Sequence, residues 1–468
     1  MDQRRETYLK AVQANFGFEF TSDQSDAIHT FFDFVMQEHG RKVWQLSGFA
    51  GTGKSSLVSA LVKTLKQEKI GFKLLAPTGR AAKVLSNFAG HPASTIHKQI
   101  YFSGNELTNS KITPAKNLFK NTLFFVDESS MVSNESEYEG PNVLMDLMNY
   151  VFQGVNCHLI FIGDLGQLPP VGQTDSPALD LDYLKNLYPQ VQLFHSELKE
   201  IVRQAADSQI TQVATELRNT SAFNLPLFSF FGTDVQRIGG ADLSELLEQS
   251  YAKHGMDECV LLTMSNKRAN QWNGEIRSRI LGHEENVAKE DILMVVKNNY
   301  FWLQPESLIG FIANGETIRI NRIGRREKLY GFEFVTAEIS FVDYPDEKPM
   351  ELILNLEALT VEAPSLSRDR LKTLFFEIEK DYYQEKNKKK RYQLILKNKY
   401  FNALQVKYSN AVTAHKAQGG QWESVFIDFG FLPEQMRNEN YIRWLYTCIT
   451  RSKKQVYLLN FPDEFFTI

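Results

Sequence analysis

A glycine-rich run followed by a lysine and a hydroxyl is the most specific chemical signal in the chain. The segment Gly48-Phe-Ala-Gly-Thr-Gly-Lys54-Ser55 lies between an apolar run predicted as a strand, 43–46, and a helix-period run, 55–67. Its glycines let the backbone curl so that N–H groups point at phosphate oxygens, while Lys54 can bridge the β and γ phosphates and the Ser55 hydroxyl can ligate Mg²⁺. We therefore expect ATP and Mg²⁺ to bind here. The residues expected to hold the nucleotide are Gly48, Ala50, Gly51, Thr52, Gly53, Lys54, Ser55 and Ser56.

Two adjacent acidic residues end another apolar run. In LFFVDESS, Asp127 and Glu128 directly follow the predicted strand 123–126. At the end of a neighbouring parallel strand, Asp127 can hold the Mg²⁺ ion with Ser55, and Glu128 can act as general base toward the attacking water. An Asp-Glu pair after a strand is by itself usually a solvated turn. Its place about 70 residues after the glycine-rich run instead predicts a site that hydrolyses the nucleotide.

The elements that must position these groups follow an α/β pattern. The first 170 residues alternate short apolar runs with longer helix-period runs, which predicts a parallel sheet with helices on both faces. A second unit of the same kind begins near residue 190, is interrupted by a β-rich block, and resumes in VTAHKAQG, VFIDFG and QVYLLNF. The expected divisions are 1–190, 191–289, 290–404 and 405–468.

Composition narrows the class of protein. The 468 residues carry 52 Lys and Arg against 56 Asp and Glu, so any nucleic-acid contact must come from a local groove rather than from a globally basic surface. No run of 18 apolar residues could form a membrane-spanning helix, and the first 20 residues lack the pattern of an export signal. Three widely spaced cysteines argue against a disulfide framework or a zinc cluster. We expect a cytoplasmic protein with no membrane contact.

An ordered set of motifs resembles superfamily 1B DNA helicases of the RecD-like and Dda-like branch. The motifs are FTSDQSDAI, GFAGTGKS, APTGRAAKVL, STIH, FFVDESSMV, GDLGQLPPV, EIVRQ, VTAHKAQG and YTCITRSK, and they span residues 20–456. The resemblance implies two RecA-like parallel-sheet P-loop domains, with a small hairpin insertion (98–120) in the first and an SH3-like insertion (290–404) in the second. It also implies ATP-driven movement 5′ to 3′ along single-stranded DNA and unwinding of forked duplex DNA. We expect a monomer that works with replication or repair proteins.

The resemblance assigns roles around the nucleotide. Gln24 matches the glutamine that reads adenine, and Gln167 in GDLGQ matches the residue that senses the γ phosphate. Arg203 in EIVRQ and Arg451 in ITRSK match two arginine fingers contributed by the second unit. A guanidinium from a facing domain would stabilise the charge that spreads over the γ oxygens and would make domain closure depend on ATP. The remaining matched positions at this site are Asp164, which orients its loop, and Gly419.

The resemblance also implies a face that holds a single strand. Hydroxyls and backbone amides suit this task because they grip phosphates without reading sequence and release them easily. For His97 and His415 the alternative is an interior histidine that shapes a loop. A wedge at the fork is expected in the hairpin insertion, at Phe102 or Tyr101, unless both rings pack beneath the hairpin. The residues expected to contact DNA are Thr78, Thr95, His97, Phe102, Thr413, His415 and Lys416, with Asn266 and Arg268 as weaker candidates.

Other functions stay open at this point. A DNA-dependent translocase or protein-displacing remodeller that does not unwind would keep every ATPase motif, so only the wedge hairpin separates it from a helicase. A P-loop switch that regulates partners is a further alternative, against which the two arginines and Glu128 argue. No additional cluster of carboxylates and lysine supports a nuclease. The basic run 386–391 is interpreted as solvated helix or, alternatively, as a contact to duplex phosphates.

Overall fold

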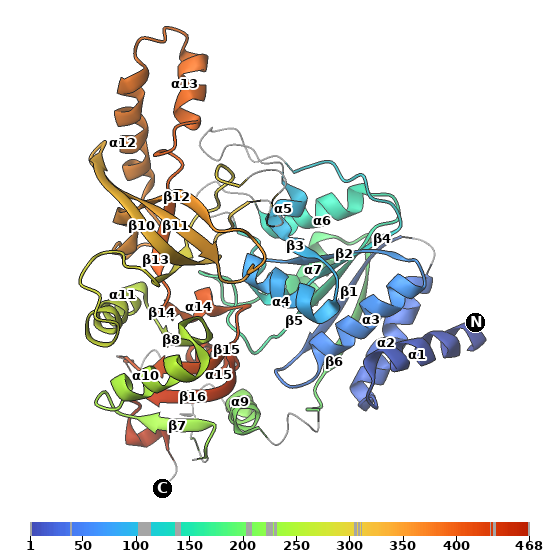
Figure 1. Ribbon diagram of the computed structural model, residues 1–468. Coiled ribbons are helices and arrows are strands. Elements are labelled where there is room, and N and C mark those ends of the chain that lie inside the picture. The colour runs from blue at the N-terminus through green and yellow to red at the C-terminus, as the bar shows by residue number, and fades with distance from the viewer. Residues whose placement is uncertain are drawn as a thin grey trace.

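The computed structural model places two α/β lobes beside each other, with a small barrel and a projecting pair of helices on the second (Figure 1). The structure describes residues 2–37, 40–101, 114–135, 142–202, 208–220, 228, 232–303, 307, 309, 311–430, 432–433 and 437–466. Within this part of the chain, no helix is long and apolar enough to cross a membrane. The three cysteines are buried and free.

The first lobe is built on a six-stranded parallel sheet in the order β3-β2-β4-β5-β1-β6. Its strands are nearly continuous apolar runs because both faces are covered. Val43 of β1 packs in the core on one face, whereas Trp44 and Leu46 pack in the core on the other. The strands are β1 (Arg41–Gly48), β2 (Gly71–Ala76), β3 (Ala93–Thr95), β4 (Thr122–Val126), β5 (His158–Gly163) and β6 (Val191–Leu198).

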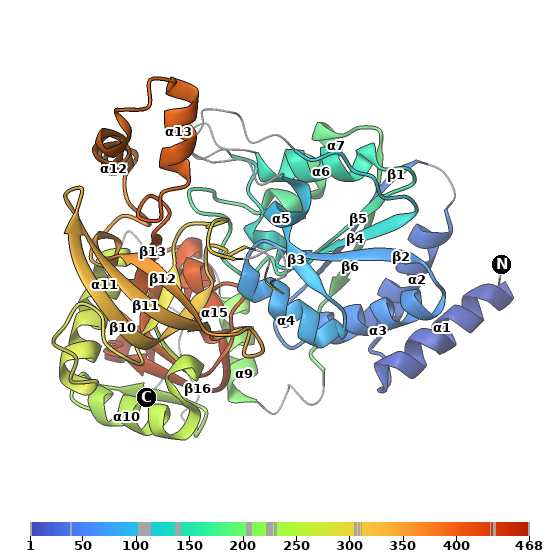
Figure 2. The same ribbon diagram turned by 45° about the horizontal axis from the view of Figure 1, so that its top comes forward.

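Helices cover both faces of this sheet, as Figure 2 shows. One core joins the sheet to α1, α2 and α3, and the other joins it to α5, α6 and α7. Helix α2 begins with a capping box between Thr21 and Gln24, and α4 begins at the Thr78 cap. The helices are α1 (Asp2–Phe16), α2 (Ser22–Met36), α3 (Lys54–Gln67), α4 (Gly79–Ala89), α5 (Ile96–Ile100), α6 (Val143–Gln153) and α7 (Leu181–Leu187).

The second lobe contains a five-stranded parallel sheet in the order β14-β8-β15-β16-β7. Two cores again flank it, one under α9, α14 and α15 and one under α10 and α11. The strands are β7 (Val235–Ile238), β8 (Cys259–Thr263), β14 (Ala411–Thr413), β15 (Trp422–Asp428) and β16 (Ser452–Leu459). The helices are α9 (Gln209–Asn219), α10 (Leu243–His254), α11 (Asn266–Glu275), α14 (Ala414–Ala417) and α15 (Glu439–Ile449).

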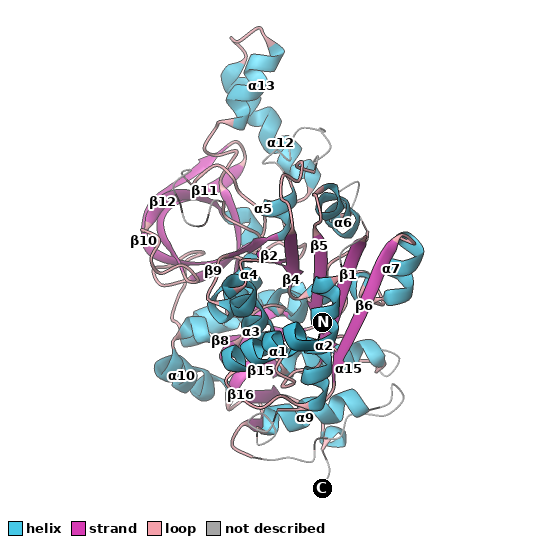
Figure 3. Ribbon diagram, turned by 90° about the vertical axis from the view of Figure 1, so that its right-hand side faces the viewer, coloured by secondary structure: helices cyan, strands magenta, loops and turns pink. Residues whose placement is uncertain are grey.

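A closed barrel interrupts the second lobe, and Figure 3 shows it nearly end-on. Its order is β10-β11-β12-β13-β9, and all pairs are antiparallel except β12 with β13. The strands are β9 (Ile292–Val295), β10 (Thr317–Leu329), β11 (Phe332–Phe341), β12 (Met350–Asn355) and β13 (Leu404–Tyr408). Between β12 and β13 the chain forms α12 (Arg368–Glu379), the 3₁₀ turn η7 (Lys380–Tyr382) and α13 (Lys388–Leu396).

The predicted fold class is confirmed, since two parallel sheets and an inserted β-barrel are present. Two expected boundaries are wrong. Strand β6 pairs with β1 along its whole length, so the first sheet continues beyond residue 190 to Leu198. Strand β13 closes the barrel, which therefore ends at Tyr408 rather than at 404. The predicted hairpin insertion, 98–120, falls partly on 102–113, which lie outside the described residues, and its first residues belong to α5.

Candidate active site

The glycine-rich loop connects β1 to α3 at the carboxyl end of the first sheet. Gly53 precedes the helix with φ +80°, a conformation that favours glycine, and the Gln24 amide lies where a Cβ would have to go. The Thr52 hydroxyl donates to Phe49 O at 2.8 Å and so braces the loop. The Lys54 ammonium donates to Gly48 O at 2.6 Å and to Phe49 O at 2.7 Å, so it lies over the loop itself. Burial lowers the pKa of Lys54, although three carboxylates nearby oppose that shift.

A cavity of about 290 Å³ opens above this loop, and both lobes line it. Its size suits a small-molecule site at the lower end of the usual range. The first lobe contributes the loop, the acidic pair after β4 and the loop after β5, and the second lobe contributes the turn after α14 and the turn between α15 and β16. Among the lining residues are Ala50, Gly51, Gly53, Lys54, Ser55, Ser56, Asp127, Glu128, Asp164, Gln167, Gly419, Thr450 and Arg451.

The two acidic residues after β4 are held in defined positions. The backbone N–H of Asp127 donates to Leu75 O, and an Asp127 carboxylate oxygen accepts from the Glu128 N–H at 2.9 Å. Glu128 has φ +50°, a left-handed conformation that is uncommon for a residue with a side chain. Burial raises the pKa of Asp127 to about 7, and the neighbouring Glu128 carboxylate adds to the effect. A cation between these groups would remove that penalty.

The donors in the cavity fit a magnesium ion bound together with a nucleotide. Ser55 and Asp127 supply hydroxyl and carboxylate oxygens, the hard ligands that Mg²⁺ takes. Among the described residues, no group of three or more His, Cys, Asp or Glu side chains could hold a metal alone. Mg²⁺ typically uses one or two protein ligands and completes its shell with phosphates and water, so this sparse set is sufficient.

Arg451 brings a charge from the second lobe into the cavity. Its guanidinium lies 3.6 Å from Glu128 Oε1 and is nearly fully buried. Arg451 Nε donates to Thr447 O at 3.2 Å and Nη1 donates to Gly420 O at 3.3 Å, which fixes the direction of the side chain. Gln167 also faces the cavity, and its Oε1 is buried without a hydrogen-bond partner in the described part of the chain. Such an atom is costly to bury and points to a ligand group.

Tyr446 was not singled out from the sequence, and it joins the two lobes at this site. Its hydroxyl accepts from the Ala50 N–H at 2.8 Å and donates to Asp164 Oδ2 at 2.7 Å. The next residue, Thr447, accepts from the Leu168 N–H at 2.9 Å through its hydroxyl. These contacts fasten α15, the helix before Arg451, to the glycine-rich loop and to the loop after β5. The only sequence signal was a tyrosine within YTCITRSK, which an apolar helix also explains.

Gln24 lies behind the glycine-rich loop rather than in the cavity lining. Its Nε2 donates to Thr52 O at 3.0 Å, and its Oε1 accepts from the Thr21 N–H at 3.1 Å. Arg203 lies outside the described residues. The residue before it, Val202, donates its N–H to Gly51 O at 3.0 Å, so the chain reaches the loop at this point.

The residues expected to contact DNA gather at the carboxyl ends of strands in both sheets. Thr78 and Thr95 cap α4 and α5, with their hydroxyls accepting from Ala81 N and Lys98 N. Thr413 precedes α14, which carries His415 and Lys416. In open parallel sheets this edge is where ligands bind. Burial lowers the pKa of His97 and of His415, which favours the neutral form of both rings.

Some of the expected DNA contacts are placed differently. Arg268, the weaker candidate, forms a two-pronged ion pair with the buried carboxylate of Asp428, at 2.6 Å and 3.1 Å. Asn266 begins α11 beside it. Tyr101 is buried and donates its hydroxyl to Asp146 Oδ2 at 2.7 Å, so it packs against α6 and is not a wedge. Phe102 lies outside the described residues.

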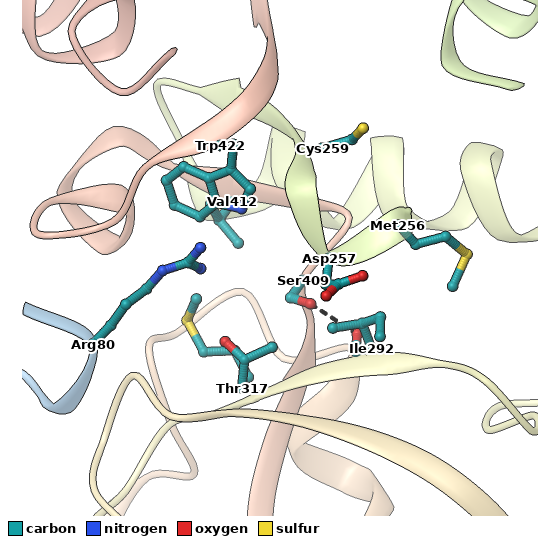
Figure 4. A pocket seen from close by; sticks show the side chains of 10 residues that line it. Arg80, Met256, Asp257, Cys259, Ile292, Thr317, Ser409, Val412 and Trp422 are labelled. Atoms are coloured by element: carbon teal, nitrogen blue, oxygen red, sulfur yellow. Dashed lines mark hydrogen bonds between the residues drawn. The ribbon is translucent and has the colours of Figure 1, made fainter. Parts of the chain in front are cut away.

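A second contact joins the lobes beside these strand ends. The Arg80 guanidinium of α4 lies 4.0 Å from the centre of the Trp422 ring, and its Nη2 donates to Gln421 O at 3.3 Å. Figure 4 shows Arg80 reaching toward Trp422, with Thr317 of the barrel close by. Gly419 adopts φ +74°, and a Cβ there would meet the Ala81 side chain at 2.7 Å. Glycine is thus required at this position by the close approach of the lobes.

The fold and the site together define a P-loop nucleotide-binding protein with two RecA-like lobes. Family models match in two regions, an AAA domain over residues 19–224 and a UvrD-like helicase C-terminal domain over residues 408–459. The chain is 30% identical over 183 residues to the ATP-dependent RecD2 DNA helicase of Deinococcus radiodurans, covering 39% of this chain and 22% of that protein. It is 30% identical over 182 residues to the ATP-dependent DNA helicase dda of Enterobacteria phage T4, covering 37% of each.

These matches span well under half of either relative. Among solved structures, that of a Pif1 helicase from Bacteroides in complex with ADP-AlF3 and ssDNA is similar with a TM-score of 0.47 and 15% identity, covering 96% of this chain and 95% of that one. By these two family models and these partial matches, the chain is similar to superfamily 1B helicases of the RecD, Dda and Pif1 type.

Proposed function

We propose that this protein hydrolyses Mg-ATP to move 5′ to 3′ along single-stranded DNA and to separate the strands of forked duplex DNA. One observation carries the proposal. Arg451 of the second lobe lies 3.6 Å from Glu128 of the first lobe, in a cavity whose floor is the glycine-rich loop. An ATP site completed by both lobes makes their closure depend on the nucleotide, and such closure is what a motor needs.

In the proposed reaction, each group in the cavity has one task. The amides of the glycine-rich loop and the Lys54 ammonium hold the phosphates, and Ser55 with Asp127 would hold Mg²⁺, which supplies positive charge at the β and γ oxygens. Glu128 takes the proton of the attacking water. Arg451 stabilises the charge that develops on the γ oxygens, and Arg203 is proposed as a second arginine with the same role. Gln167 senses the γ phosphate through its amide.

The proposed movement uses the strand ends of both sheets. Thr78 and Thr95 of the first lobe and Thr413 with Lys416 of the second would hold phosphates of one strand. Closing and opening the cleft changes the distance between the phosphate-binding residues of the two lobes. If the lobes release the strand in turn, the protein moves along it. The names of two relatives, both ATP-dependent DNA helicases, support this substrate.

Strand displacement and ATP hydrolysis should be measured side by side on 5′-tailed and 3′-tailed duplexes. We expect single strands to stimulate hydrolysis and only the 5′-tailed duplex to be separated. Lys54→Ala should abolish hydrolysis, and Arg451→Ala should lower kcat by about 10³-fold while ATP still binds. Arg279→Ala, which removes an exposed arginine paired with Glu275, is the matched control.

Each outcome of this experiment has a distinct meaning. Normal turnover by Lys54→Ala would reject the site, and hydrolysis that ignores DNA would reject the motor. Stimulated hydrolysis without strand separation would instead favour the alternative, a translocase or protein-displacing remodeller that does not unwind. Separation of the 3′-tailed duplex alone would reverse the proposed polarity.

A further inference from the structure

A strongly basic helical arm stands on the barrel. We use the name helical arm for residues 365–399, which include α12, η7 and α13. The arm contains eleven Lys and Arg but five Asp and Glu, a net charge of +6 in a chain whose total is −4. Figures 1 and 3 show that it projects away from both sheets. The nucleotide cavity does not include any of its residues.

The helical arm is firmly mounted. Leu374 and Ile378 of α12 and Ile395 of α13 are buried in a core shared with the barrel. Arg370 forms an ion pair with Glu357 at 2.6 Å, which ties the base of α12 to the turn after β12. A second ion pair, Arg391 to Glu379 at 2.9 Å, joins the two helices to each other. The tip of the arm is therefore presented in a fixed direction relative to the barrel.

Three lysines at the tip are left without acidic partners. Lys386, Lys388 and Lys389 are exposed and make no side-chain ion pair or hydrogen bond within the described part of the chain. The acidic residues near them are already used, since Glu385 pairs with Lys390 at 2.8 Å and Glu379 pairs with Arg391. Like charges so close together repel each other, and an anion bound at the tip would relieve that repulsion.

We propose that Lys386, Lys388 and Lys389 bind the phosphate backbone of duplex DNA next to the junction with the single strand. The proposal rests on the proposed function, because it takes the partner to be DNA. The barrel borders the proposed single-strand path, where a Cβ on Gly315 would lie 4.0 Å from Thr78 Cβ. A duplex that continues from that strand past the barrel would come within reach of the arm, which stands on the barrel.

The chemistry of the tip favours a duplex over other anionic partners. Double-stranded DNA presents one charge per roughly 1.7 Å of axis, about twice the density of one strand, and lysines contact it without reading sequence. The arm carries a net charge of +6 and the whole chain a net charge of −4, so the rest of the chain is net negative. That negative charge repels DNA except where local groups contact it. A rigid basic projection overcomes that repulsion on one side of the junction.

The test compares a single strand with the same strand joined to a duplex. Fluorescence anisotropy would measure binding of both DNAs over a range of salt concentrations, for the full-length protein and for Lys386→Ala/Lys388→Ala/Lys389→Ala. We expect tailed-duplex affinity to fall about tenfold or more and its log–log salt slope to shrink by about 2 to 3, because up to three phosphate contacts are lost. Single-strand affinity should change less than twofold.

Two controls keep the result specific. Lys63→Ala/Lys66→Ala/Lys185→Ala removes the same charge from exposed positions on α3 and α7 and should leave both affinities unchanged. Lys386→Arg/Lys388→Arg/Lys389→Arg keeps the charge and should retain duplex binding. Normal binding of the tailed duplex by the tip variant would overturn the proposal. The partner of the three lysines would then be an acidic protein instead of DNA. Equal losses on both DNAs, or in the control variant, would overturn the proposal as well.

The proposed function can fail separately. If single strands neither bind nor stimulate hydrolysis by the unaltered protein, the motor proposal is wrong. If single strands bind and stimulate hydrolysis, but the tip variant shows no specific loss of affinity for the tailed duplex, only the assignment of the arm is wrong.

Discussion

At the scale of single residues, the Tyr446 hydroxyl connects parts of the site that come from different lobes. Tyr446 bridges the Ala50 N–H and the Asp164 carboxylate, and it lies on the helix that leads to Arg451. Burial raises the pKa of Tyr446 well above its ordinary value, so the hydroxyl stays protonated and can always donate to Asp164. Its role is to set the distance between the glycine-rich loop and Arg451.

Tyr446→Phe should lower kcat for ATP by about tenfold or more while KM changes less. The ring still packs, but the buried Asp164 carboxylate loses a partner, at about 1–3 kcal/mol, and the half-buried Ala50 N–H loses one too. Steady-state kinetics in the presence of saturating single strand would measure the effect. Tyr441→Phe on the same helix is the control, because the Tyr441 hydroxyl is buried without a partner among the described residues. An unchanged kcat in Tyr446→Phe would show that the bridge does not position Arg451.

At the scale of elements, the short helix α14 links the proposed DNA grip to the lobe interface. It begins after β14, carries Lys416, and leads directly into Gly419 against Ala81 of α4. Burial lowers the pKa of Lys416 to about 8, and the nearby Lys407 ammonium contributes further. The lysine is thus charged below about pH 8 and neutral above it, whereas an ordinary lysine keeps its charge to about pH 10.

Single-strand affinity should therefore decline as the pH rises from 7 to 9. The decline follows from loss of the Lys416 charge that faces a phosphate, and anisotropy at constant ionic strength would measure it. Lys416→Arg should flatten the profile because a guanidinium stays charged throughout this range. Lys66→Arg, at an exposed position on α3, should keep the decline. The same decline in Lys416→Arg would assign the titration to another group.

At the scale of the whole molecule, the first lobe is held by contacts on two sides. The nucleotide cavity joins it to α15, and Arg80 of α4 joins it to Trp422 of the second lobe. The following turn of α4 reaches the barrel instead, where Lys83 lies 4.8 Å from the centre of the Tyr344 ring. Because Arg80 lies beside Thr78, its stacking on Trp422 connects the proposed DNA contact to lobe closure.

Arg80→Ala should weaken the coupling between DNA and nucleotide by about threefold or more. Coupling is measured as the ratio of the affinities for a non-hydrolysable ATP analogue with and without single-stranded DNA. The expected decrease in this ratio follows from the loss of a cation–π contact worth about 0.5–2 kcal/mol. Lys83→Ala, which removes the contact to the barrel, should leave the ratio unchanged. If Arg80→Ala retained the full ratio, closure would be transmitted through other contacts.

Much of each lobe could be predicted from apolar runs and the turns that follow them. The expected strand 43–46 lies within β1, and the expected strand 123–126 lies within β4. The pairing of β6 with β1 could not be predicted, because a strand that ends one sheet and a strand that begins another have the same apolar pattern. The sequence indicated the helical arm only through the basic run 386–391, because the orientation of the arm depends on a core shared with the barrel.

The sequence by itself determined the local chemistry of this protein. Lys54 and Ser55, like Asp127 and Glu128, are neighbours in the chain, so short-range backbone geometry alone places the first pair at the start of α3 and the second at the end of β4. The tertiary structure alone decided that Arg451 meets Glu128 and that the Tyr446 hydroxyl reaches the Ala50 N–H. Those groups lie hundreds of residues apart, and the distance between them depends on how two separately packed lobes close on each other, which no local spacing encodes.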